Sequence, residues 1–146
     1  MKRLSYIILL IFLSVPFYSS FADKPFDEWN RKDVIAYFEA NNIIFEGEYR
    51  NTENGLDVLI GRLNSRTEKV YMNFFLKEGK LEKALLTVYE NKTFNSIQNR
   101  VEEQGFARIS ESNDKLGNQY TKFSSGSVEL TVLNKTADWP EVYFQP

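Results

Sequence analysis

Four short runs in which apolar and polar residues alternate lie between residues 43 and 89 of this chain. They cover residues 43–50, 56–63, 69–76 and 81–89, and the segments between them are rich in Asn, Ser, Thr, Lys and Gly. Alternation at period two between turn residues is typical of half-buried strands that are joined by hairpins. The sequence therefore predicts an antiparallel meander of four strands.

The connection Lys77-Glu78-Gly79 predicts how the third and fourth runs pair. As a three-residue loop with Gly79 in the left-handed conformation, it sets a register that separates two faces. The first face holds Val70, Met72, Phe74, Leu76, Ala84, Leu86 and Val88. The second face holds Tyr71, Asn73, Phe75, Leu81, Lys83, Leu85, Thr87 and Tyr89.

Two segments have helical periodicity instead. Residues 28–41 follow Asp27, and residues 94–104 follow Thr93, which we expect to cap the second helix. Gly105 stands where a helix ends in the left-handed conformation. Further alternating runs cover residues 107–112, 119–124, 127–133 and 141–144.

The element order is thus a helix followed by four strands, twice. The halves align with Val34, Phe38, Asn42 and Ile43 against Ile97, Val101, Gly105 and Phe106, which predicts an internal pseudo-repeat. Helices that interrupt an antiparallel sheet pack on one of its faces, so we expect a two-layer α+β fold with seven or eight strands and two helices. The element order is similar to that of small exported proteins such as the beta-lactamase inhibitor protein. This likeness brings no specific motif and assigns no family.

The N-terminus has the three parts of a secretory signal. Lys2 and Arg3 precede an apolar stretch over residues 4–17, and the small residues Ser20 and Ala22 follow. Ser14, Pro16 and Ser19 interrupt the apolar stretch, which is shorter than a spanning helix needs. We expect cleavage near Ala22, a single α+β domain over residues 23–146, and no membrane span after cleavage.

The chain has no cysteine, so no disulfide supports the fold and burial of apolar surface must do so. This composition favours a bacterial periplasmic or secreted protein. The formal net charge is −2, and loss of Lys2 and Arg3 makes the remainder more acidic. Such a chain has no overall attraction to phosphate backbones, so nucleic acid is not an expected partner.

The chain also has no histidine. Without imidazole and thiol groups, the Ser-His-acid triad, thiol catalysis and the usual zinc, haem and iron–sulfur ligand sets are excluded. Ser112 and Lys115 have the spacing of serine acyl-enzymes but lie in a turn-like segment without companion motifs. Residues 51–57 only superficially look like a calcium loop, because Arg50 takes the first ligand position. We expect no cofactor and no metal.

Paired carboxylates are the catalytic arrangement that the sequence leaves open, since two acids that act together need not be neighbours in the chain. The adjacent candidates, Glu46 with Glu48 and Glu102 with Glu103, read as solvated strand or helix faces. Asn91-Lys-Thr and Asn134-Lys-Thr fit the glycosylation pattern, and in a bacterial protein we read them as turn residues.

Aromatic and polar residues on the second sheet face predict a partner-binding surface, because Tyr and Phe offer large contact area at small entropic cost. The candidate residues are Tyr71, Phe75, Leu85, Thr87, Tyr89, Trp139 and Tyr143. The alternative is that the first helix or the C-terminal segment covers this face and makes it more core.

The sequence therefore favours an exported, non-enzymatic protein-binding module, such as an inhibitor or immunity-type protein, whose partner is another envelope or secreted protein. One alternative is a carrier that holds a small apolar ligand in a cavity between helices and sheet. A further alternative is a carboxylate-based glycan hydrolase.

Overall fold

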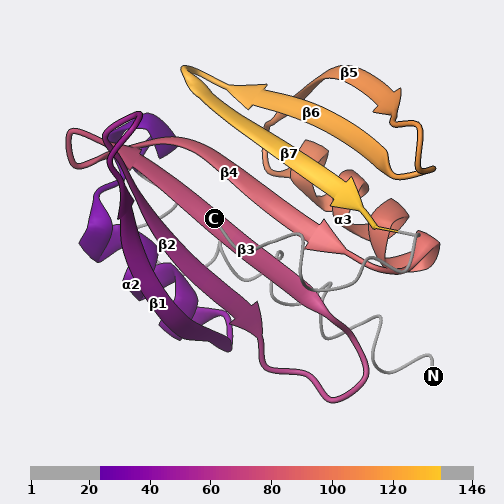
Figure 1. Ribbon diagram of the computed structural model, residues 1–146, viewed down its shortest axis with the longest axis horizontal. Coiled ribbons are helices and arrows are strands. Elements are labelled where there is room, and N and C mark those ends of the chain that lie inside the picture. The colour runs from indigo at the N-terminus through magenta and orange to yellow at the C-terminus, as the bar shows by residue number, and fades with distance from the viewer. Residues whose placement is uncertain (1–23, 136–146) are drawn as a thin grey trace.

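A computed structural model describes residues 24–135, and the seven strands in this part of the chain form one sheet (Figure 1). The spatial order is β1-β2-β3-β4-β7-β6-β5. The strands are β1 (Ile43–Asn51), β2 (Leu56–Leu63), β3 (Val70–Lys77), β4 (Lys80–Val88), β5 (Ala107–Asn113), β6 (Gln119–Ser125) and β7 (Val128–Asn134). The predicted α+β class is confirmed. The predicted strand over residues 141–144 lies outside the described residues.

Five of the six neighbouring strand pairs in the described sheet are antiparallel, as expected from hairpin connections. The sixth pair, β4 with β7, is parallel and joins the first four strands to the last three. The sheet is therefore mixed. The sequence pattern did not predict this pairing, because it is not made by a hairpin.

Helices α2 (Arg31–Ala40) and α3 (Asn91–Glu103) lie on the same side of the sheet, behind it in the view of Figure 1. Val34 and Phe38 of α2 and Ile97 and Val101 of α3 are fully buried, and all four belong to one core cluster with the inward-facing residues of the strands. The two layers that the sequence predicts are present in the described residues.

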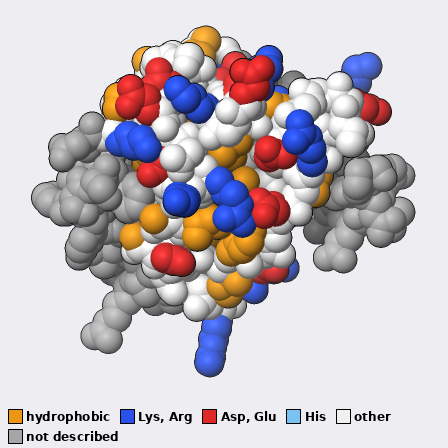
Figure 2. Space-filling view, turned by 90° about the vertical axis from the view of Figure 1, so that its left-hand side faces the viewer, with side chains coloured by type: hydrophobic (Ala, Val, Ile, Leu, Met, Phe, Trp, Pro, Cys, Tyr) orange, Lys and Arg blue, Asp and Glu red, His pale blue; other side chains and the backbone are white. Residues whose placement is uncertain are grey.

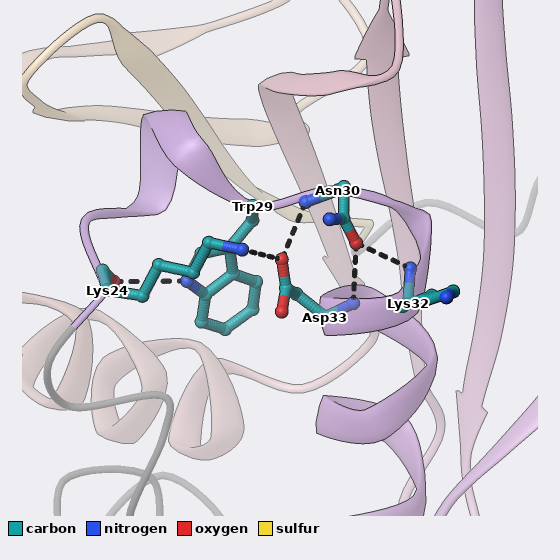
Figure 3. Close-up of polar contacts among 5 residues, drawn as sticks. All are labelled: Lys24, Trp29, Asn30, Lys32 and Asp33. Carbon is teal, nitrogen blue, oxygen red and sulfur yellow. Dashed lines mark hydrogen bonds and ion pairs between the residues drawn. The ribbon is translucent and has the colours of Figure 1, made fainter.

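Helix α2 begins at Arg31, three residues later than predicted, because Asn30 rather than Asp27 caps it (Figure 3). The Asn30 Oδ1 accepts hydrogen bonds from the backbone N–H groups of Lys32 and Asp33 at 2.9 and 3.2 Å. In return, the Asp33 carboxylate accepts the Asn30 N–H at 2.9 Å, which completes a capping box. Residues Phe26–Glu28 form a short 3₁₀ turn, η3, instead of the first helical turn.

Helix α3 begins at Asn91, three residues earlier than predicted. Thr93 is not its cap but a buried residue inside the first turn, and Glu90 at the cap position makes no side-chain capping bond. The predicted end is confirmed, since Gly105 has a φ of +95°.

The aligned positions of the two halves have matching environments. Asn42 and Gly105 both adopt the left-handed conformation that ends a helix, with φ of 56° and 95°. The other three aligned positions are Val34 and Ile97, Phe38 and Val101, and Ile43 and Phe106. All six residues are buried in the same core. Within residues 24–135, the pseudo-repeat is thus a helix and four strands followed by a helix and three strands.

The hairpin between β3 and β4 differs from the prediction. Lys77 pairs with Lys80, so the loop has two residues, Glu78 and Gly79, with φ of 51° and 81°. Two left-handed residues give the turn type whose twist matches that of the flanking strands. The predicted three-residue loop is wrong.

A bulge follows this turn and changes the face of one residue. Leu76 pairs with Leu81 while Phe75 pairs with Lys83, which leaves Glu82 as the extra residue. Leu81 therefore points into the core and is 4% exposed. Its predicted position on the second face is wrong, while the other residues of β3 and β4 have the predicted alternation of burial.

Gly61 of β2 gives a direct test of this packing. A Cβ atom at this position would lie 2.7 Å from the Ile43 Cγ2 and 2.8 Å from the Phe38 Cζ. We expect Gly61→Ala to lower the free energy of unfolding by about 1–3 kcal/mol, because the core must shift to accept the methyl group. Urea denaturation measures this loss. Ile43→Ala, which removes the Cγ2 atom, should cost less stability in the Gly61→Ala background than in the unmodified chain. An unchanged denaturation midpoint in Gly61→Ala would contradict this close approach.

Candidate functional site

The candidate site is the face of β2, β3 and β4 that points away from α2 and α3, which we call the outer face. The strand register places on it Leu56, Val58, Ile60, Arg62, Tyr71, Asn73, Phe75, Lys77, Lys80, Lys83, Leu85 and Thr87. Tyr89 follows β4 at the same end as Thr87. Alternation of side chains along each strand separates these residues from the core.

Five of the predicted binding residues lie together on the outer face. Tyr71, Phe75, Leu85 and Thr87 are half-buried, and Tyr89 is 39% exposed. The rings of Tyr71 and Tyr89 contact each other edge to face, with centroids 6.2 Å apart. The other two predicted residues, Trp139 and Tyr143, lie outside the described residues.

The structure adds apolar residues that the sequence analysis did not select. Val58 of β2 lies between Tyr49 of β1 and Phe75 of β3, and Ile60 lies beside Asn73. The alternation within β1 and β2 indicates which of their residues share a face. It does not show which of these faces lies on the same side as Tyr71 and Phe75 of β3, because that depends on the strand pairing.

Three buried apolar residues do not belong to the main core cluster. Leu56, Val58 and Leu133 are 4%, 1% and 8% exposed, and they lie at outer-face positions of their strands. These outer-face positions are therefore apolar and buried, and this part of the face is not a solvated polar surface.

Charged side chains of both signs lie around these apolar residues. Lys77, Lys80, Lys83 and Arg62 occupy outer-face positions of β2–β4, and Glu129 of β7 lies beside Lys83 on the same face. The Lys83 Nζ lies 5.1 Å from the centroid of the Phe75 ring, a cation–π contact. Arg62 pairs with Glu46 of β1 at 2.6 Å, and Lys77 lies 4.0 Å from Glu82 of the bulge.

The two edges of the described sheet are less suited to binding than the outer face. Edge strand β1 has a bulge between Phe45 and Gly47, and edge strand β5 has one between Arg108 and Ser110. Figure 2 shows the β1 side, where apolar side chains lie among charged ones. Bulges and charges on edge strands oppose the addition of another strand.

Helix α2 does not cover the outer face. Its residues Tyr37 and Phe38 contact Phe74, whose ring centroid lies 5.9 Å and 5.4 Å from theirs, on the opposite side of the sheet. One part of the alternative considered from sequence is thus wrong. The other part, cover by the C-terminal segment, concerns residues outside the described range.

A cavity between the helices and the sheet bears on the carrier alternative. Its volume is about 30 Å³, and its lining is apolar apart from Gln104, with Trp29, Phe74, Val101 and Phe106 among the lining residues. Pockets for small ligands have volumes of roughly 300–1,000 Å³. In this conformation, the cavity has room for a water molecule or two but not for a lipid-like ligand.

The carboxylate pairs bear on the hydrolase alternative. Glu48 accepts two hydrogen bonds of 2.9 Å from Arg31, and Glu46 pairs with Arg62, all with exposed side chains. Glu102 and Glu103 likewise pair with Arg108 and Arg100. These four carboxylates form surface ion pairs with arginines, as expected of solvated faces.

Glu68 is the carboxylate with the most unusual surroundings. It lies just before β3, and its Oε2 is buried without a hydrogen-bond partner. Burial, and then the nearby Glu90 carboxylate, raise the pKa of Glu68, while Lys92 lowers it. Glu90 itself is exposed, so Glu68 and Glu90 are not two buried acids that face each other across a cleft.

The other motifs singled out from sequence lie in turns. Ser112 and Lys115 are exposed at the end of β5 and in the turn after it. The Asp114 carboxylate in that turn accepts hydrogen bonds from the Asn118 side-chain amide, the N–H groups of Asn118 and Leu116, and the Tyr120 hydroxyl. These donors hold its pKa below its usual value. Its oxygens serve the turn itself.

The two glycosylation-type asparagines contact each other. The Asn134 Nδ2 donates to the Asn91 Oδ1 at 2.7 Å and to the Gln119 Oε1 at 3.1 Å, and Asn134 is fully buried. Because Nδ2 is the atom that carries the glycan, Asn134 is inaccessible to glycosylation in the folded chain. Its amide instead ties the end of β7 to α3 and β6.

Comparisons with known proteins give only a remote structural likeness. Methylmalonyl-CoA epimerase from Streptomyces coelicolor matches at 11% identity and a TM-score of 0.31, over 75% of this chain and 91% of that one. The Mycobacterium tuberculosis epimerase matches at 11% and 0.31, over 80% and 85%, and a hypothetical protein from Bacillus halodurans at 15% and 0.30, over 76% and 90%. TM-scores this low carry no argument about activity or ligand. No family model and no curated protein matches the chain.

Residues 24–135 contain neither a membrane-spanning helix nor a metal-binding cluster of acidic residues. In this range, no helix has the length and apolar character needed to cross a membrane. The same range contains no group of three or more acidic residues positioned to hold a metal ion.

The raised pKa of Glu68 predicts a pH-dependent effect on stability. Because folding disfavours the charged form of Glu68, the folded state loses stability as pH rises through the interval between the unfolded and folded pKa values. Glu68→Gln should therefore gain stability relative to the unmodified chain as pH rises from about 4, near the ordinary Glu pKa, toward neutral. Urea midpoints measured across this range test the effect, with the exposed Glu53→Gln as control. A midpoint difference that does not change with pH contradicts it.

Proposed function

We propose that this chain is an exported, non-enzymatic binding module that holds another envelope or secreted protein on its outer face. The observation that carries the proposal is the chemistry of that face. Tyr71, Phe75, Leu85 and Tyr89 form a partly exposed apolar surface on the sheet, and the buried residues Leu56 and Val58 lie on the same face. Large aromatic side chains on rigid elements are typical of protein interfaces.

The absence of histidine and cysteine from the chain supports a binding function over catalysis. The arginine pairing of Glu46, Glu48, Glu102 and Glu103 further supports it, because these carboxylates are neither desolvated nor close to one another in a cleft. A binder of inhibitor or immunity type needs only a surface of the right shape and chemistry.

Replacement of the aromatic residues tests the binding surface. We expect Tyr71→Ser, Phe75→Ser and Tyr89→Ser together to reduce partner capture from envelope extract to background, because the variant loses the main apolar contacts. The urea midpoint of the variant should stay close to that of the unmodified chain, since the three side chains are partly exposed.

A matched control removes apolar side chains elsewhere. Ile109 and Leu116 are 57% and 56% exposed and lie on and beyond β5, away from the outer face of β2–β4. Ile109→Ser with Leu116→Ser should leave capture unchanged. Retention of the partner by the folded triple variant contradicts the assignment of the outer face.

Export gives a second test. If residues 1–22 are a signal peptide, the protein recovered from its own cell should begin at Asp23 and be found outside the cytoplasm. Intact-mass measurement and N-terminal sequencing check this. Recovery of the full-length chain from the cytoplasm contradicts export.

A further inference from the structure

We infer that the cavity between the helices and the sheet is a binding site for a small neutral aromatic molecule, and that residues 24–29 form a strap that closes it. This inference does not rest on the proposed function, because it concerns the helix side of the sheet and not the outer face. The way in which Phe26 of the strap completes the wall of the cavity carries it.

The wall of the cavity is thinnest at the strap. All the lining residues except Phe26 and Gln104 are buried, so these two side chains lie between the cavity and solvent. The centroid of the Phe26 ring lies 4.8 Å from that of Trp29 in the strap and 4.9 Å from that of Phe106, which follows α3. Phe26 therefore closes the cavity by ring contacts and not by continuous secondary structure.

The strap is fixed at its two ends but not in its middle. At one end, the Lys24 Nζ contacts the Asp33 carboxylate at 2.6 Å, and the Lys24 carbonyl accepts the Trp29 indole N–H at 3.2 Å (Figure 3). At the other end, the Trp29 carbonyl accepts the Leu81 N–H at 2.8 Å. Among residues 24–135, the backbone groups between these anchors bond only within the strap. Phe26 can therefore turn outward without loss of either anchor.

The lining favours a neutral aromatic ligand. No Asp, Glu, Lys or Arg of the described residues lines the cavity, so a charged ligand would lose its hydration without gaining a partner. The rings of Trp29, Phe74 and Phe106 line it and favour contact with another ring, which Phe26 provides in the closed state. The ligand thus takes the place of the Phe26 ring.

Tyr37 of α2 supplies a hydrogen-bonding group for such a ligand. Tyr37 lines the cavity and is 5% exposed, and its hydroxyl makes no hydrogen bond with another residue in the described part of the chain. A ligand hydroxyl would supply this bond. The closed cavity of about 30 Å³ is smaller than the roughly 150 Å³ that hold a benzene molecule, so a ring enters only when Phe26 leaves.

Calorimetric titration of the full chain with phenol and with benzene tests the site. We expect saturable binding of phenol to the unmodified chain and about tenfold tighter binding to Phe26→Ala, because this variant has no ring to displace. Tyr37→Phe should lower the affinity for phenol by about fivefold, through loss of one hydrogen bond, and should leave the affinity for benzene unchanged.

A second variant leaves the lining of the cavity intact and serves if Phe26→Ala does not fold. Lys24→Met removes the ion pair with Asp33 and should tighten phenol binding, because a strap with one weaker anchor opens more easily. Lys32→Met is the matched control. It makes the same change on a side chain that points away from the strap in Figure 3, and it should leave the affinity for phenol unchanged.

The inference is overturned if the unmodified chain does not bind phenol, because the strap then stays closed. It is also overturned if the unmodified chain, Lys24→Met and Phe26→Ala bind phenol equally. The triple variant at Tyr71, Phe75 and Tyr89 should bind phenol as the unmodified chain does. Loss of phenol binding in that variant places the phenol on the outer face and overturns the assignment of the cavity.

Discussion

The parallel pairing of β4 with β7 is the interaction on which the rest of this structure depends. It runs from Lys83 beside Glu129 to Val88 beside Asn134, and the Lys135 N–H continues it with a 2.8 Å bond to the Val88 carbonyl. Through it, the first four strands and the last three become one sheet. Parallel neighbours need a crossover connection. Helix α3 lies in that connection and packs against the sheet beside β7.

The two faces of this single sheet are unlike. Because α2 and α3 lie on one side, the apolar residues of that side form a single core, which the capping box at Asn30 and the close approach at Gly61 help to define. The other side receives no described helix. There Tyr71, Phe75 and Leu85 remain partly exposed beside charged side chains, which makes the outer face the candidate site.

Much of the fold could be predicted from the sequence, and the errors have local physical causes. The start of α2 was misplaced because Asn30 and Asp33 form a reciprocal cap, which outweighs a lone Asp27 before the helix. Leu81 was assigned to the wrong face because two left-handed residues shorten the hairpin and a bulge leaves Glu82 without a cross-strand partner. Both errors arise where alternative local hydrogen bonds compete and periodicity does not choose between them.

The sequence by itself determined the α+β class, the alternation that places Tyr71, Phe75, Leu85 and Thr87 on one face, and the lack of imidazole and thiol chemistry, because these follow from residue types and from spacing along one strand. Only the tertiary structure decided that β4 pairs with β7, that Val58 and Ile60 join the same surface, and that Glu129 lies beside Lys83 on it. Those neighbours are distant in the chain. Their contact depends on which strand edges meet, and burial of the shared core fixes that choice.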